Sequence, residues 1–288
     1  MSEGADIPLQ ARVALAHAAV QRLAEGCGVD LLHIKGPAVD PSLRGRPRTG
    51  SDVDVIVRPS GVGRLMTALA EHGWRTETTF DAGSAFDHAA NLYHPDWGLL
   101  DVHRHYPGMD RDPTAVFALL WDERVHADIA HVPCPVPEPI AQSLVLLLHA
   151  ARSRAVAEHP DVAPNWDDRT EAERAAILDL ADRTGARIAL AAATGELAAY
   201  AGHADAALWE VFTTGGDRLD EWSARWRAAR GTRAKASVAV RSLAVNRYYL
   251  GQRLGHEPSR PEVATEFFRR LAAGCRAVGG RLRRRVRR

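Results

Sequence analysis

The stretch SDVDVIV, residues 51–57, constrains the fold of this chain more than any other segment. Polar and apolar residues alternate strictly, and valine and isoleucine favour extended structure, so the stretch is predicted to be a β-strand. Side chains at positions i and i+2 of a strand lie on the same face, which puts Asp52 and Asp54 together and the valines on the opposite face. The apolar end of the stretch indicates a strand inside a sheet rather than at its edge.

Two carboxylates side by side on a strand repel each other, and their burial is costly unless a cation offsets them. Mg²⁺ prefers one or two carboxylates together with substrate phosphates. Two such ions, about 3.5–4 Å apart, stabilise the attacking and leaving oxygens of a phosphoryl transfer. The alternative is a solvated strand face, although aspartate is depleted in strands. Asp52 and Asp54 are therefore predicted to bind two Mg²⁺ or Mn²⁺ ions.

Two further segments supply candidates for the same site. The strand-like segment GLLDVHRHY, residues 98–106, carries Asp101 in an apolar context, where it would add a third carboxylate. The segment HIKGP ends a short apolar run with Lys35 and Gly36. Glycine lets the backbone approach a phosphate closely, and the lysine ammonium is a point charge for a triphosphate. Only two of the 37 basic residues are lysines, so a lysine at this position suggests a chemical role.

The segment between these motifs is rich in arginine, with Arg44, Arg46 and Arg48. These side chains are either solvated or within reach of phosphates, and Arg48, nearest in sequence to the aspartates, is the one expected at a phosphate. His103 and His105 follow Asp101 at i+2 and i+4. An Asp–His–His site for a transition metal is therefore an alternative to the carboxylate site.

His149 lies in the apolar helical segment QSLVLLLHAARSR. It is either a core histidine with a satisfied hydrogen bond or, together with Arg152 and Arg154, a contact for the nucleotide or the acceptor. We expect His103, His149 and Arg152 to be substrate contacts.

The spacing of apolar residues and turn signals predicts the order of the elements. Helices are expected at residues 8–26 and 60–73, the second with Ser60 as its N-cap. Strands are expected at residues 30–36, 51–57, 74–80, 84–94 and 98–106, followed by a short pair of strands around Val125 and Val132. Residues 37–45 are predicted to form a short helix or turn, and residues 157–168 a loop.

A proline-rich break at residues 134–139 separates this α/β part from residues 140–273, whose periodicity is helical throughout. Thr170 and Glu173 have the spacing of a helix capping box. We therefore predict an α/β core with an N-terminal helix in residues 1–135, an α-helical domain in residues 136–275 and a disordered basic tail in residues 276–288.

Composition excludes several classes of protein. No apolar run is long enough to span a membrane, and the N-terminus lacks the pattern of a secretory signal, so a cytoplasmic protein without a membrane partner is expected. Cys27, Cys134 and Cys275 have no paired spacing, which argues against a disulfide framework and a cysteine zinc site. The motifs of P-loop NTPases and α/β-hydrolases are absent.

The formal net charge of +1 argues against long nucleic acid as the partner. The exception is the C-terminus, which has seven arginines between residues 276 and 288. This segment is either a solvated tail or a contact for RNA, an anionic lipid or an acidic partner.

The motifs IKGPAV, LRGRPRTGSDVDVIV and LLDVHRHY resemble those of the nucleotidyltransferases of the DNA polymerase β superfamily. The chain is most similar to the bacterial nucleotidyltransferase family five, and the resemblance covers roughly residues 10–210. It implies an α+β fold, with a small mixed β-sheet flanked by helices and a following α-helical domain. It also implies magnesium-dependent transfer of a nucleoside monophosphate from an NTP, with ATP favoured.

The resemblance assigns roles by position. Asp52 and Asp54 would be the metal-binding pair, and Asp101 the third carboxylate, which helps to activate the acceptor hydroxyl. Lys35 and Gly36 stand where many superfamily members have Gly-Ser, a departure that bears on the triphosphate contact. Ser51 stands where a glycine is frequent and would help to position a phosphate.

The acceptor is left open between a small molecule, a peptide or protein side chain, and RNA. The family's occurrence near peptide-modification genes makes a peptide acceptor worth testing. Two alternatives to this function are a catalytically inactive module that binds a nucleotide or a regulatory partner, and a toxin-like enzyme that nucleotidylates RNA or protein. The presence of all three aspartates argues against the inactive module.

Overall fold

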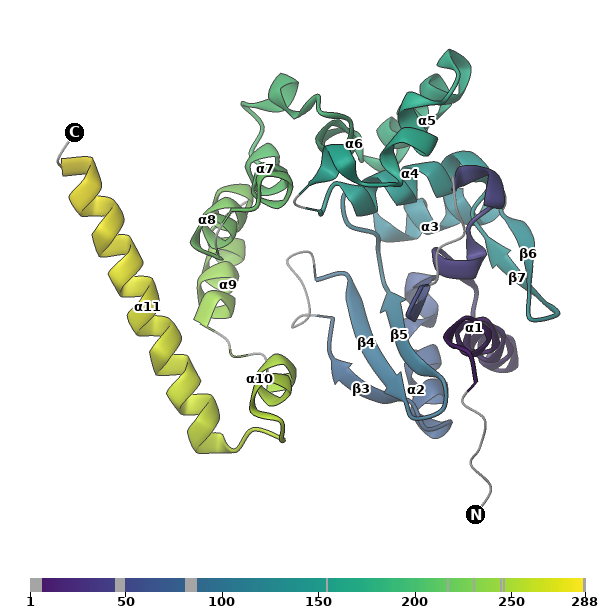
Figure 1. Cartoon of the computed structure of the whole chain (residues 1–288), viewed down its shortest axis with the longest axis horizontal. Helices are drawn as coiled ribbons and strands as arrows, with labels where there is room; N and C mark the ends of the chain where they lie inside the picture. Colours follow the sequence, from purple (N-terminus) through teal and green to yellow (C-terminus); the bar gives the residue numbers. More distant parts are fainter. Residues whose placement is uncertain are drawn as a thin grey trace. The chain divides into compact units, whose positions relative to one another are not determined.

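The structure is a computed structural model that describes residues 7–44, 50–80, 87–153, 155–216, 218–229, 231–243, 245 and 247–286. The chain forms two compact units, Met1–Ala199 and Tyr200–Arg288. Figure 1 shows both units, with labels on the α-helices and on strands β3 to β7. All of the candidate site residues described below belong to the first unit.

The first unit contains a mixed five-stranded sheet with the strand order β1-β2-β5-β4-β3. The strands are β1 Leu31–His33, β2 Asp52–Val57, β3 Arg75–Thr78, β4 Ala89–His94 and β5 Gly98–His103. Strands β2 and β5 are parallel, and the other neighbouring strands are antiparallel. Strand β2 therefore lies inside the sheet, as its apolar end indicates. The α+β fold and the mixed sheet are confirmed.

One face of the sheet is apolar and is covered by two helices. Val53, Val55 and Val57 are fully buried on this face. They pack in one cluster with side chains of α1 Leu9–Gly26 and α2 Val62–Glu71. At about 25 cal/mol per Å² of apolar surface, this burial is the main force that holds β2 in register. Asp52 and Asp54 are consequently directed to the opposite face.

Helix α2 begins one residue later than expected. Its N-cap is Gly61, which has no side chain to cap the helix, and Ser60 lies in a 3-10 helix that spans Pro59–Gly61. Pro59 starts this turn because its restricted φ angle suits a first helical position. A Cβ atom at Gly61 would lie 2.8 Å from Val29 Cγ1, so the close approach of the chain at this point requires glycine.

A short helix and a hairpin complete the strand-containing part. Helix α3 spans Pro113–Asp122, and the antiparallel pair β6 Val125–Ile129 and β7 Val132–Val136 follows it. The predicted pair of strands is confirmed. Ala130 and His131 both have positive φ angles, the conformation that a two-residue hairpin turn requires.

Every element that the structure describes after β7 is helical, and the prediction for this part of the chain is confirmed. The first unit contains α4 Pro139–Ala150, α5 Glu171–Thr184 and α6 Arg187–Thr194. Thr170 and Glu173 form the predicted capping box at the start of α5. The segment predicted as a loop at 157–168 contains a single π-helical turn, Ala163–Asp167. The change from strands to helices falls at Val136, and a domain boundary at this residue stays a prediction.

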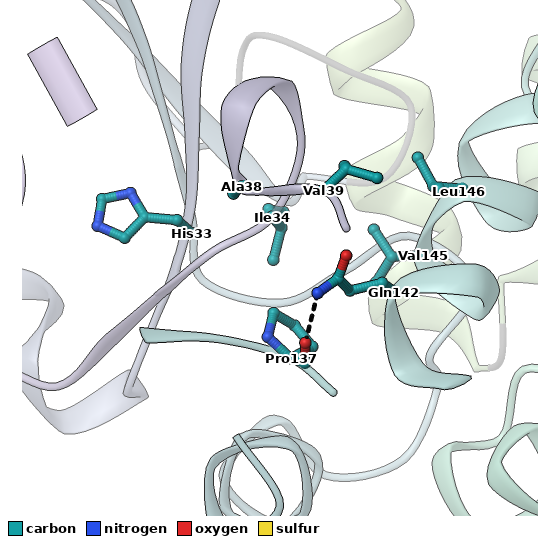
Figure 2. Close-up of a pocket in the computed structure, with 8 residues that line it drawn as sticks. All are labelled: His33, Ile34, Ala38, Val39, Pro137, Gln142, Val145 and Leu146. Carbon is teal, nitrogen blue, oxygen red and sulfur yellow. Dashed lines mark hydrogen bonds between the residues drawn. The ribbon is translucent and has the colours of Figure 1, made fainter. Parts of the chain in front are cut away.

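A small cavity lies between the sheet and α4 (Figure 2). Its volume is about 10 Å³, enough for one water molecule at most. Gln142, one of its lining residues, joins the helix to the segment after β1. Gln142 of α4 donates a hydrogen bond to the carbonyl oxygen of Pro137 at 2.7 Å and accepts one from the backbone N–H of Asp40 at 2.8 Å. The bond from Asp40 attaches α4 to the segment that follows Lys35 and Gly36, and the bond to Pro137 holds the connection between β7 and α4.

The second unit is helical. Its helices are α7 Ala206–Thr214, α8 Arg218–Ala228, α9 Thr232–Leu243, α10 Arg247–Leu254 and α11 Arg260–Val286. Residues 276–286, which we expected to belong to a disordered tail, continue α11, because arginine is a good helix former and no proline interrupts the segment. No helix in the described parts of the chain is long and apolar enough to cross a membrane.

Two buried histidines join α1 to β1 and predict an acid-sensitive core. His17 Nδ1 lies 2.8 Å from His33 Nδ1, and both residues are fully buried. Burial lowers the pKa of His17 from 6.5 to about 4, against the opposing attraction of Asp54, and burial also lowers the pKa of His33. Both rings are therefore neutral in the folded protein at neutral pH.

The unfolded chain takes up these protons near pH 6.5, whereas folded His17 takes one up only near pH 4. The free energy of unfolding is therefore highest above pH 6.5. It falls as the pH decreases toward 4, by about 3 kcal/mol for His17 alone. Urea unfolding between pH 7 and pH 4 measures this dependence. His17→Gln is expected to flatten it, whereas the same change at the exposed His126 is not. Equal slopes in the wild type and His17→Gln would contradict the assignment.

Candidate functional site

Four polar side chains form one row across the sheet, on the face opposite the apolar core. Asp54 of β2 is the register partner of Asp101 of β5, and Asp101 is the partner of Asn91 of β4. Asn91 is in turn the partner of Thr78 of β3. The row is connected by hydrogen bonds, because the Thr78 hydroxyl donates to Asn91 Oδ1 and Asn91 Nδ2 donates to Asp101 Oδ1.

Asp52 lies two residues before Asp54 on the same face and is half-buried. Ser51 Oγ donates a hydrogen bond to Asp52 Oδ1 at 3.3 Å. Among the described residues, Asp54, Asp101 and His103 form a group of potential metal ligands whose atoms lie within 4.8 Å of one another, and Asp52 is not part of it. Both Asp52 and Asp54 nevertheless line the same cavity.

Lys35 lies directly against the carboxylates. Its Nζ is 2.6 Å from Asp54 Oδ1, and the two side chains are 15% and 4% exposed. Burial alone would lower the pKa of Lys35, but attraction to the Asp54 carboxylate outweighs it and the pKa is raised. The lysine is therefore charged. Gly36 follows with φ +56°, which favours glycine, and begins a 3-10 helix, Gly36–Ala38.

His103 is the second partner of Asp54. Its Nε2 lies 3.0 Å from Asp54 Oδ1, and the ring is fully buried. Burial lowers the pKa of His103 to about 4, with Asp54 opposing the shift, so the ring is neutral and donates its Nε2–H to the carboxylate. Strand β5 ends at His103, and His105 is outside the group of potential ligands. The predicted alternative with both histidines as ligands therefore reduces to His103.

The surroundings of the three carboxylates shift their pKa values in different directions. Burial would raise the pKa of Asp54, but Lys35 and His103 outweigh it and hold that pKa far below its usual range. Burial, followed by repulsion from Asp54, raises the pKa of Asp101 to about 6 and also raises that of Asp52. A cation among these oxygens would relieve the repulsion, and the carboxylates of Asp52, Asp54 and Asp101 offer the oxygen ligands that Mg²⁺ prefers. The residues present therefore fit a divalent metal ion.

The carboxylates of Asp52 and Asp54 open into a cavity of about 180 Å³, whereas Asp101 is not among its lining residues. Its lining from the sheet side consists of Lys35, Gly36, Arg44, Gly50, Asp52 and Asp54, and from the helical side of Leu146, His149 and Asp161. Arg44 Nη1 donates to the Gly36 carbonyl oxygen at 3.3 Å. Arg44 is thus the arginine of this segment that the structure brings to the cavity, whereas Arg46 and Arg48 lie outside the described residues.

Arg152 orients the histidines at the helical wall. Its Nη2 lies 3.1 Å from His149 Nδ1, and its Nη1 lies 3.3 Å from His88 Nε2. Burial, followed by the charges of Lys35 and Arg152, lowers the pKa of His149 to about 3, so the ring is neutral. Because a guanidinium only donates, His149 Nδ1 accepts, and its proton is on Nε2. His149 therefore has an N–H donor available at the cavity wall.

Sequence reasoning missed several residues around the site. Asp161 lines the cavity from the segment predicted as a loop, and Asn165 joins that segment to the site by donating to the carbonyl oxygens of Asp161 and Leu43. Asn91 and Thr78 were not singled out either. The available signal for Asn91 was an asparagine within an apolar strand segment, a residue type that strands disfavour.

A family model described as an uncharacterised nucleotidyltransferase matches residues 9–202. No curated protein matches the chain.

Three solved structures are similar to the chain at low identity. The crystal structure of the lincosamide antibiotic adenylyltransferase LnuA, bound to lincomycin, is 17% identical over 59% of this chain and 97% of that chain, with a TM-score of 0.34. The solution structure of the antibiotic-resistance factor ANT(2'')-Ia is 18% identical over 66% and 93%, with a TM-score of 0.37. An antigenic nucleotidyltransferase-like protein from Paracoccidioides brasiliensis is 16% identical over 63% and 93%, with a TM-score of 0.38. These scores lie below 0.5, whereas the family model matches most of the chain.

Proposed function

Since the chain belongs to the uncharacterised nucleotidyltransferase family, and is thus a nucleotidyltransferase, we propose that it moves a nucleoside monophosphate from an NTP, with ATP favoured, to an acceptor hydroxyl. Pyrophosphate is the second product. The observation that carries this proposal is the convergence of buried carboxylates beside Lys35. Asp54 and Asp101 are register partners on parallel strands, and Asp54 and Asp52 line one cavity with Lys35 and Gly36.

Asp52, Asp54 and Asp101 are the residues that would hold Mg²⁺ or Mn²⁺, as two ions. When bound, the metal neutralises the charge on the phosphates and polarises the phosphoryl oxygens. His103 donates to Asp54 and so orients this carboxylate, a bond typical of residues that support metal ligands.

The remaining cavity residues bind and orient the substrates. Lys35 has its charge next to Asp54 and would contact the triphosphate. Gly36 would let the backbone approach a phosphate closely, and Ser51 would offer its hydroxyl group to a phosphate. We propose Arg48, together with Arg44, as phosphate contacts. His149, oriented by Arg152, would donate its Nε2–H to an acceptor atom of the nucleotide or of the second substrate.

The transfer needs no covalent intermediate with the protein. The acceptor oxygen attacks the α-phosphorus in line, and the bond from the α-phosphorus to the bridging oxygen breaks with its electron pair on pyrophosphate. Asp101 accepts the proton of the hydroxyl. The protein contributes mainly by positioning the two substrates and by offsetting charge.

The experiment that tests this function compares two labels on ATP. Label at the α-phosphate is expected to appear in the acceptor and label at the γ-phosphate is not. The acceptors to be tested are small hydroxylated molecules, peptides with Ser, Thr or Tyr, and RNA with a free 3′ hydroxyl. The peptide and RNA arms also test the toxin-like alternative, in which the basic C-terminal segment steers a macromolecular target. Transfer of the γ-label would contradict nucleotidyl transfer.

A further inference from the structure

The polar row on the sheet depends on a bulge in β3. Arg75 pairs with Tyr93 and Thr76 with Leu92, but Asn91 then pairs with Thr78 rather than Glu77. The register shift between Thr76 and Thr78 therefore brings a buried hydroxyl group opposite Asn91, in the position that a regular ladder would give to a glutamate. Bulges of this kind re-aim side chains and are frequent next to active sites.

The hydrogen bonds of the row run in one direction. An ionised carboxylate only accepts hydrogen bonds, so the amide of Asn91 must turn its Nδ2 toward Asp101. Asn91 Oδ1 is then left facing β3, and the Thr78 hydroxyl donates to it. Without that hydroxyl, Asn91 Oδ1 would lack its donor inside the sheet, and burying such an acceptor unpaired costs about 1–3 kcal/mol.

The two oxygens of Asp101 consequently differ. Oδ1 is occupied by the amide of Asn91, whereas Asn91 makes no bond to Oδ2. Asp54, on the strand at the other side of Asp101, and His103, two residues further along β5, offer ligand atoms within 4.8 Å. A carboxylate held through one oxygen has a fixed plane, and its second oxygen then has a fixed direction.

We propose that Asn91 and Thr78 are positioning residues, which act through Asp101 by holding its Oδ1 and directing its Oδ2 to the metal or to the acceptor hydroxyl. This inference rests on the proposed function, because it needs Asp101 to take part in the site. The amide of Asn91 and the hydroxyl of Thr78 add nothing to the apolar packing of a sheet face, and the bulge adds cost, so orientation of Asp101 accounts for the presence of these two groups.

The test measures the Mg²⁺ concentration at which ATP binding is half-saturated, by titration calorimetry on the full chain. Asn91→Ala is expected to raise this concentration about 10- to 100-fold, the usual cost of removing a residue that supports a metal ligand. ATP binding in EDTA is expected to be unchanged. Thr78→Val, nearly isosteric and without the donor, shifts the value in the same direction, and Thr78→Ser, which keeps the donor, restores it.

Two comparisons separate positioning from loss of folding. Thr76→Val makes the same chemical change at an exposed site on the same strand, so it is expected to behave as the wild type. Adding Thr78→Val to Asn91→Ala is expected to have no further effect, because Thr78 acts through Asn91. The inference would be overturned if the effects of Thr78→Val and Asn91→Ala on this Mg²⁺ concentration were additive. It would also be overturned if Thr78→Val and Thr76→Val had the same half-saturating Mg²⁺ concentration. If the wild type itself shows no Mg²⁺-dependent ATP binding, the proposed function fails instead.

Discussion

Asp54→Asn is expected to reduce Mg²⁺-dependent ATP binding and nucleotidyl transfer by about 100-fold or more. Residues that only support a metal ligand already account for up to about 100-fold, so a ligand in direct contact should account for at least as much. Asp54 is also the shared partner of Lys35 and His103, which makes it the centre of the site. An amide at this position keeps the shape of the side chain and removes the charge.

Asp54→Asn is expected to change the free energy of unfolding less than it changes the affinity for ATP with Mg²⁺. Asp52 and Asp101 remain near Lys35 and offset part of its charge, and removal of Asp54 also removes a repulsion from both carboxylates. Asp30→Asn is the matched control, because Asp30 forms an ion pair with Arg58 at 2.8 Å and does not line the cavity. Isothermal titration of ATP with and without Mg²⁺ measures the effect. Equal ATP affinities of Asp54→Asn and Asp30→Asn would contradict the role of Asp54.

Lys35→Met is expected to lower the free energy of unfolding more than Asp54→Asn does. It leaves the fully buried Asp54 carboxylate without its ammonium partner, and breaking a buried pair in this way costs about 3–5 kcal/mol. Added Mg²⁺ is expected to recover part of the lost free energy of unfolding, because the metal then offsets the carboxylate. ATP affinity is expected to fall as well, since the triphosphate loses a positive charge.

Lys235→Met is the control for this change, because Lys235 is the other lysine of the chain and stacks over Trp226 in the second unit. Urea unfolding with and without Mg²⁺ measures both variants. A similar loss in the two variants, or a loss in Lys35→Met that Mg²⁺ leaves unchanged, would show that Lys35 does not act through Asp54.

The elements that carry the site could be predicted because their signals are local. Alternation over residues 51–57 determines which face Asp52 and Asp54 occupy, and the three valines need no partner information to indicate the core. The pairing of Asp54 with Asp101 is a different matter, because it depends on β2 and β5 being parallel neighbours. Spacing alone does not specify this pairing, and the expectation for Asp101 rested on its place in an apolar strand segment and on the family resemblance.

The features that were missed depend on contacts between distant segments. The bulge at Thr78 is set by how β3 pairs with β4, and the cavity position of Asp161 is set by a link between Asn165 and Leu43. The failure of Ser60 as a cap has a local cause, because Pro59 already starts a turn there. For Thr78 and Asp161 the polar residue was visible in the sequence, but the segment that positions it was not.

The measurement that tests the central claim most directly is ATP binding to the wild type and to Asp52→Asn/Asp54→Asn, with Mg²⁺ and with EDTA, and with the other common NTPs for comparison. The metal site proposed here predicts tight binding by the wild type that requires Mg²⁺ and is lost in the double variant. Binding that is indifferent to both Mg²⁺ and the two substitutions would contradict a metal site at these carboxylates.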